Sequence, residues 1–123
     1  MRNPKLDDLS FEDLLDSRDL QERIEELEDI AEENEIDQNE QEELLVLLKL
    51  KEEIEWAGWE HGISLIRESY FEEYAEDFFD DCYAHNIPAN LRSYIDYKAF
   101  ARDLQMDYSI VEFNGVDYWF VEA

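Results

Sequence analysis

The chain has 123 residues, with 35 Asp or Glu against ten Lys or Arg and a formal net charge of −25. Since DNA, RNA and anionic membranes are bound through basic surfaces, this charge argues against direct binding to any of them and favours a basic protein partner. A hydrophobic content of 45%, with 14% aromatic residues, argues against a disordered chain because it supplies enough apolar surface for a core.

Cysteine content and hydropathy indicate the cellular compartment of the protein. The single cysteine, Cys82, excludes an internal disulfide, and no apolar run approaches the roughly 20 residues that span a bilayer. No apolar segment follows the first basic residues, as it would in a secretory signal. We therefore expect a soluble cytoplasmic protein.

Up to residue 55 the pattern is helical. Ser10 with Asp13 has the form of a capping box and predicts a helix start, and Ser17 predicts the cap of the next helix. That next helix, running to about Glu33, has an apolar stripe at steps of three and four residues: Leu20, Ile24, Leu27 and Ile30.

A second amphipathic helix follows a short polar turn. Asp37 and Glu40 form a capping-box pair, and the apolar residues after them are Leu44, Leu47, Leu48 and Ile54. Two antiparallel helices are therefore expected. A two-helix coiled coil is the competing interpretation, but three heptads are not sustained.

The segment from Trp56 to Gly62 interrupts the helical pattern with two glycines and two tryptophans. Because glycines permit turns, this segment predicts a boundary between an acidic helical region, 1–55, and a second region, 56–123. The charge covers both, with 21 acids and six bases before Trp56 and 14 acids and four bases from it onward. The tryptophans are expected to pack in a core rather than to form a ligand cage.

The second region mixes helices and strands. We expect a strand at 63–66, a helix at 70–83 after a Ser69 cap, and a helix at 96–106. A hairpin is expected from Tyr108–Phe113 to Val116–Val121, because the turn Asn114-Gly115 between them tolerates positive φ, as a type I′ turn requires. A lone hairpin is marginal in water, so it should pack on the helices or gain the 63–66 strand. The predicted fold class is α+β.

Two rows of acids stand out on the predicted helices. From residue 70 to 83 pairs of apolar and acidic residues alternate, and the acids are Glu72, Glu73, Glu76, Asp77, Asp80 and Asp81. A second row comprises Glu25, Glu26, Glu28, Asp29, Glu32 and Glu33. Since like charges four residues apart weaken a helix by about 0.2–0.5 kcal/mol per pair, helix stability does not explain them. The rows indicate an anionic surface that binds a basic partner, and the alternative is two ordinary solvated helix faces.

No catalytic, metal or cofactor site is predicted. Cys82 and His85 have zinc-ligand spacing, but with only His61 besides, a tetrahedral set is not expected, and Cys82 is interpreted as a buried apolar residue. Asp96-Tyr97-Lys98 resembles a nuclease motif, yet a nuclease also needs a basic cleft for DNA, which this composition argues against.

Four segments between Gly62 and the C-terminus carry a family resemblance: residues 63–76, Ile87-Pro88-Ala89-Asn90-Leu91-Arg92-Ser93-Tyr94-Ile95-Asp96-Tyr97, Phe100-Ala101-Arg102-Asp103-Leu104, and Asn114-Gly115-Val116-Asp117-Tyr118-Trp119. Through these segments the stretch resembles the ArdA antirestriction family of plasmids, transposons and phages, whose members act in the cytoplasm of the bacterial host. The resemblance implies an elongated homodimer that mimics DNA and occupies the DNA-binding groove of a type I restriction-modification enzyme. It also implies that no residue is catalytic. The acidic positions that correspond to the family's acidic surface are Glu68, Glu72, Glu73, Glu76, Asp96 and Asp103. We do not expect a counterpart of the family's N-terminal α/β part in this sequence, which leaves the length of the mimicked duplex open.

The expected function is therefore non-enzymatic inhibition of type I restriction-modification enzymes by DNA mimicry. Two alternatives stay open: inhibition of another DNA-binding defence protein, such as a CRISPR effector, or an acidic chaperone for basic proteins. A homodimer is expected from the resemblance, and also because Tyr108, Phe113, Tyr118, Trp119 and Phe120 exceed what a small hairpin buries alone.

Overall fold

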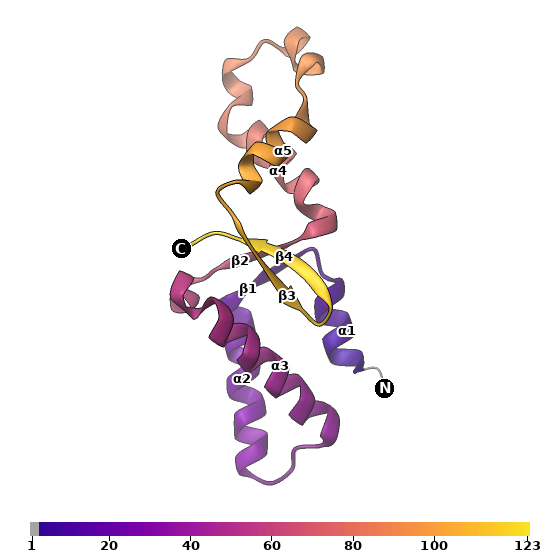
Figure 1. Cartoon of the computed structure of the whole chain (residues 1–123), viewed down its shortest axis with the longest axis vertical. Coiled ribbons are helices and arrows are strands. Elements are labelled where there is room, and N and C mark those ends of the chain that lie inside the picture. The colour runs from indigo at the N-terminus through magenta and orange to yellow at the C-terminus, as the bar shows by residue number, and fades with distance from the viewer. Residues whose placement is uncertain (1–2) are drawn as a thin grey trace.

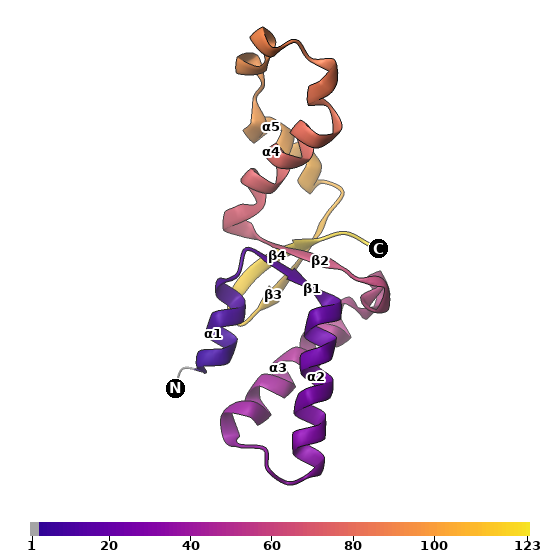
Figure 2. The same cartoon turned by 180° about the vertical axis from the view of Figure 1, so that it is seen from behind.

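A computed structural model describes residues 3–123 and shows an elongated molecule with its sheet near the middle (Figure 1). Helices α2 (Ser17–Glu32) and α3 (Gln38–Ile54) form a hairpin at one end, and α4 (Phe71–Cys82) and α5 (Tyr97–Gln105) form the other. Helix α1 (Pro4–Phe11) lies beside the sheet, as the view from behind also shows (Figure 2). Short 3-10 turns occupy Glu55–Ala57, Trp59–His61, Glu68–Tyr70, Ala84–Asn86 and Ala89–Tyr94.

The sheet has four antiparallel strands in the order β1-β2-β4-β3. The strands are β1 (Leu14–Asp16), β2 (Ser64–Arg67), β3 (Ser109–Phe113) and β4 (Val116–Phe120). The predicted α+β class is confirmed. The predicted hairpin is also confirmed, because β3 pairs with β4. The strand expected at 63–66 joins the hairpin, because β2 pairs with β4. Asn114 and Gly115 both have positive φ, 51° and 78°, as the predicted turn requires.

The N-terminal helix begins earlier than predicted. Asn3 caps α1, its side chain accepting a hydrogen bond from the Leu6 amide, and Pro4 takes the first helical position, where its missing N–H costs nothing. Ser10 instead lies in the last turn of α1, so the predicted start at Ser10 is wrong. The strand β1 was not predicted, because three residues are too few to show alternation and β1 exists only through its pairing with β2.

The caps of the next two helices differ in how well they were predicted. Asp16, not Ser17, caps α2, accepting from the Arg18 amide. Ser17 is buried, where its hydroxyl donates to the Trp59 carbonyl and accepts from the Ile63 amide, at 2.8 and 2.7 Å. The capping box of α3 is confirmed, with Asp37 and Glu40 bonded reciprocally.

Two apolar cores lie on opposite faces of the sheet. The larger joins the sheet to α1, α2 and α3 and includes Leu6 and Leu15 together with Leu65 and Tyr118. Residues from both sides of the predicted boundary at Trp56 therefore share one core. The smaller joins the other face to α4 and α5 through the buried residues Ile66, Phe71, Ala75 and Ala101.

Two side-chain predictions fail in part. Trp59 is buried, but Trp56 is 63% exposed. Its ring makes a T-shaped contact with Phe120, with centroids 5.9 Å apart, and its Nε1 donates to the Glu53 carbonyl at 3.1 Å. Cys82 is exposed rather than buried, because the last turn of α4 extends away from the sheet (Figure 1). Within residues 3–123, no helix has both the length and the apolar content needed to cross a bilayer.

Candidate protein-binding surface on the acidic helices

The first acidic row follows α2. This helix buries one stripe, Leu20, Ile24 and Leu27, against the larger core. Because an α-helix has 3.6 residues per turn, acids that lie outside this stripe face solvent. All six members of the row are exposed: Glu25, Glu26, Glu28, Asp29, Glu32 and Glu33.

The second row follows α4 and obeys the same rule. Phe71 and Ala75 are buried, while Phe78 and Phe79 are half-buried in ring contacts with Phe100 on α5. The acids between them are all exposed: Glu72, Glu73, Glu76, Asp77, Asp80 and Asp81. The Tyr97 hydroxyl donates to the Asp80 carboxylate at 3.0 Å, which fixes one member of the row to α5.

The remaining predicted acids, Glu68, Asp96 and Asp103, are also exposed. Asp96 caps α5, accepting from the Ala99 amide at 3.1 Å, so helix capping accounts for its presence without any partner. Glu68, Glu72 and Asp96 border a shallow hollow of about 490 Å³, which the bases Lys98 and Arg102 also line. Their negative charge is therefore partly compensated locally.

The two rows lie at opposite ends of the molecule, with the sheet between them (Figure 1). The structure thus brings Glu68, Glu72 and Asp96 together but does not merge the rows on α2 and α4 into one site. Any partner that contacts both rows has to follow the long axis of the molecule.

Basic side chains near α2 and the sheet form ion pairs and hydrogen bonds within the chain. These contacts were not predicted from the sequence. Arg18 pairs with Asp16 at 2.9 Å, and these hydrogen bonds lower the pKa of the Asp16 carboxyl. Arg67 donates to the Ser10 carbonyl and to the Ser69 hydroxyl, at 2.9 and 2.6 Å. These contacts occupy hydrogen-bond donors of both guanidinium groups within the chain, although Arg18 itself stays exposed.

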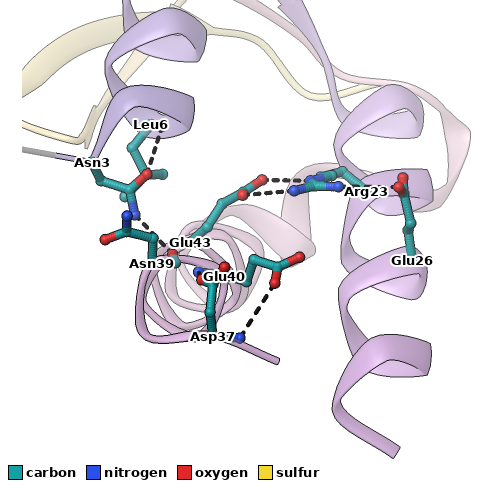
Figure 3. A network of polar contacts seen from close by, with 8 residues as sticks. All are labelled: Asn3, Leu6, Arg23, Glu26, Asp37, Asn39, Glu40 and Glu43. Atoms are coloured by element: carbon teal, nitrogen blue, oxygen red, sulfur yellow. Dashed lines mark hydrogen bonds and ion pairs between the residues drawn. The ribbon is translucent and has the colours of Figure 1, made fainter. Parts of the chain in front are cut away.

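The most enclosed of these contacts joins α2 to α3. Arg23 donates from Nε and Nη2 to the two carboxylate oxygens of Glu43, at 2.6 and 2.9 Å (Figure 3). Glu43 is only 1% exposed and is the one buried acid among the 35. A signal was available in the sequence, because Glu43 continues the apolar stripe of Leu47, Leu50 and Ile54 at helical spacing.

Metal chemistry finds no support in the described part of the chain, residues 3–123. There, no three His, Cys, Asp or Glu side chains come together in a way that could hold a metal ion. His85 lies one turn beyond Asp81, with Nε2 3.0 Å from the carbonyl oxygen of that residue.

Comparison with protein families gives one match, to the antirestriction protein (ArdA) model over residues 8–117. The chain belongs to the ArdA antirestriction family. Searches of curated proteins and of solved structures found no match.

The ArdA match runs from within α1 to the start of β4 and therefore includes both acidic helices and the strands β1, β2 and β3. The resemblance noted in the C-terminal half is confirmed, and the family relationship extends across the N-terminal helices, where no motif had been recognised. As an ArdA protein the chain acts in antirestriction, against restriction-modification enzymes.

Proposed function

We propose that this ArdA-family chain is a non-enzymatic DNA mimic that occupies the DNA-binding site of a type I restriction-modification enzyme. The observation that carries the proposal is the placement of acids: all 15 predicted site residues are exposed, on helices held by two apolar cores. An ordered carboxylate array attracts the Lys and Arg side chains that a DNA-binding cleft needs for phosphates.

Charge density supports the comparison with DNA. On α4 the row places six carboxylates in ten residues, from Glu72 to Asp81. At about 1.5 Å of rise per residue this is one charge per about 2.5 Å, against about 1.7 Å for duplex DNA with both strands counted. The target enzyme would thus meet a charge spacing close to that of its substrate.

We also propose that the active form is a homodimer. The hairpin aromatics do not support it, because Phe113, Tyr118 and Phe120 are buried within the chain itself. Support comes instead from residues 82–95, the longest stretch without Asp or Glu. This stretch forms the end of the molecule beyond α4 and α5 and exposes Tyr83, Leu91 and Tyr94 (Figures 1 and 2). Two chains of charge −25 repel least when they meet through such a surface.

A competition experiment tests the DNA-mimic proposal. A purified type I enzyme is bound to labelled duplex DNA, and the protein is added at increasing concentration. We expect the DNA to be displaced and to remain uncut, with less displacement at higher salt because exposed charges are screened within about 8–10 Å. A stable complex containing enzyme, DNA and inhibitor at one site would contradict the proposal.

Phage plating separates the proposal from its alternatives. Hosts carrying a type I, a type II or a CRISPR system are infected with and without the protein. Rescue of plating only in type I hosts supports the proposed target, and rescue in CRISPR hosts alone would instead favour a CRISPR effector. Binding to histone-like basic proteins without any rescue would favour the chaperone alternative.

A further inference from the structure

The outer end of the α2–α3 hairpin is strongly charged and lacks a core. Residues 28–42 contain eight Asp or Glu and no Lys or Arg. None of their side chains is buried, and the half-buried apolar residues are Ile30, Ala31 and Ile36. Repulsion between the two helices therefore acts where apolar packing is weakest.

The pair Arg23–Glu43 joins α2 to α3 by polar contacts close to this outer end, and Leu27, one turn further along α2, is the last buried side chain of that helix. The two parallel hydrogen bonds of the pair fix direction as well as distance, which an apolar contact does not. Hydrogen bonding to Glu43 raises the pKa of Arg23, so the guanidinium stays charged. Arg23 also contacts the exposed Glu26 of the acidic row, at 3.1 Å.

Further polar contacts tie the same part of α3 to α1. The side chain of Asn3 donates to the Asn39 carbonyl at 2.8 Å while capping α1 (Figure 3). The first turn of α3 is thus anchored to α1, and α2 is joined to α3 by Arg23 and by the apolar core, which reaches Leu27. Without Arg23, Leu27 would be the one buried contact left beside the acidic end of α2, and an apolar contact does not fix direction.

We infer that Arg23 and Glu43 are positioning residues that hold the acidic end of α2 at a fixed angle to α3, against the repulsion between their carboxylates. The inference rests on the proposed function, because a mimic of a stiff duplex needs its charges at fixed places. Glu43 contributes no charge to the surface but decides how the surface charges are arranged.

The test uses the full chain and the double variant Arg23→Met/Glu43→Leu, which leaves the net charge at −25. Replacing a buried ion pair with apolar residues is often neutral or stabilising, so this variant should fold. The matched control is Lys49→Met/Glu53→Leu, which also replaces one base and one acid with Met and Leu, at two exposed positions of α3. A second variant, Glu43→Gln, keeps the shape of the side chain and removes only its charge.

Geometry is measured without any target. Spin labels are placed at Glu28→Cys and Gln41→Cys, two exposed positions, with Cys82→Ser removing the native thiol. We expect one narrow distance distribution in the parent and the control. In Arg23→Met/Glu43→Leu and in Glu43→Gln we expect a broader distribution shifted to longer distances at low salt, which narrows as salt screens the repulsion.

Inhibition is then measured with the unlabelled variants. The half-inhibitory concentration should rise several-fold for Arg23→Met/Glu43→Leu, although its melting temperature is unchanged or higher, and should not change for the control. A narrow, salt-independent distribution in the folded double variant would overturn the inference, and so would a broad one with full inhibition. The DNA competition experiment uses the unmodified protein, so it tests the proposed function independently of these variants.

Discussion

The hydroxyl of Tyr118 on β4 donates a hydrogen bond to the backbone carbonyl of Glu12, 2.9 Å away, although 106 residues separate them. Glu12 follows α1 and precedes β1, so the contact joins the last strand to the N-terminal segment. The Tyr118 ring is fully buried in the larger core, and burial raises its pKa to about 12. This residue therefore reports on the attachment of the N-terminal segment to the sheet.

Alkaline pH should destabilise the fold through Tyr118. Because the pKa of this group rises from 10.0 in the unfolded chain to about 12 in the fold, its contribution is complete below pH 10.0 and is lost as the pH rises towards 12. Tyr118→Phe should lose about 1 kcal/mol at neutral pH with its hydrogen bond and should weaken this pH dependence. Denaturant unfolding at several pH values measures both effects, with the exposed Tyr94→Phe as control; equal pH dependence in all three proteins would contradict the prediction.

Neutralising the α4 row should impair inhibition and spare the fold. The variant carries Gln at Glu72, Glu73 and Glu76 and Asn at Asp77, Asp80 and Asp81. Each exposed charge contributes about 1 kcal/mol or less, so single exchanges should have small effects and the sixfold variant a large one. The same treatment of Glu25, Glu26, Glu28, Asp29, Glu32 and Glu33 should act similarly or less.

The control for this prediction removes six exposed charges outside the rows, with Gln at Glu35, Glu52, Glu53, Glu55, Glu60 and Glu122. Displacement of DNA from the enzyme is measured for each variant, together with its circular dichroism. Equal losses in the control and in the row variants would show that total charge, rather than the arrangement on the helices, determines inhibition.

Salt should move the two proposed associations in opposite directions. Binding to a basic target weakens with salt, whereas contact between two chains of charge −25 strengthens because their repulsion is screened. Sedimentation at rising ionic strength should show an increasing dimer fraction. Tyr94→Glu should shift the protein to monomer, and Leu45→Glu on α3, another exposed apolar position, should not. A wild-type monomer throughout the series would contradict the dimer.

Replacing the turn glycine at position 115 should destabilise the hairpin. Gly115 has φ of 78°, and nothing lies within 4 Å of a Cβ built there, so a substitution meets backbone strain and no clash. Gly115→Ala should therefore cost about 1 kcal/mol in unfolding free energy. Ser109→Ala in the same hairpin serves as control. A stability unchanged by Gly115→Ala would mean that the turn relaxes to another type.

Local features with a strong chemical signature could be predicted from the sequence alone. The Asp37–Glu40 capping box and the Asn114-Gly115 turn need only residues close in the chain, and the structure has both. The exposure of the two acidic rows also follows from helical periodicity, once Leu20, Ile24 and Leu27 or Phe71 and Ala75 face a core. The ArdA relationship rested on such local motifs in the second half of the chain.

Features that depend on distant partners were decided by the tertiary structure. The strand β1 forms because Leu15 pairs with Leu65. Glu43 can be buried because Arg23, across the hairpin, donates two hydrogen bonds to its carboxylate and balances its charge. Neither partner can be read from sequence spacing. The sequence predicts which faces are anionic, since helical period and charge are local properties. The distance between those faces depends on the fold, because the sheet that separates them takes strands from both ends of the sequence.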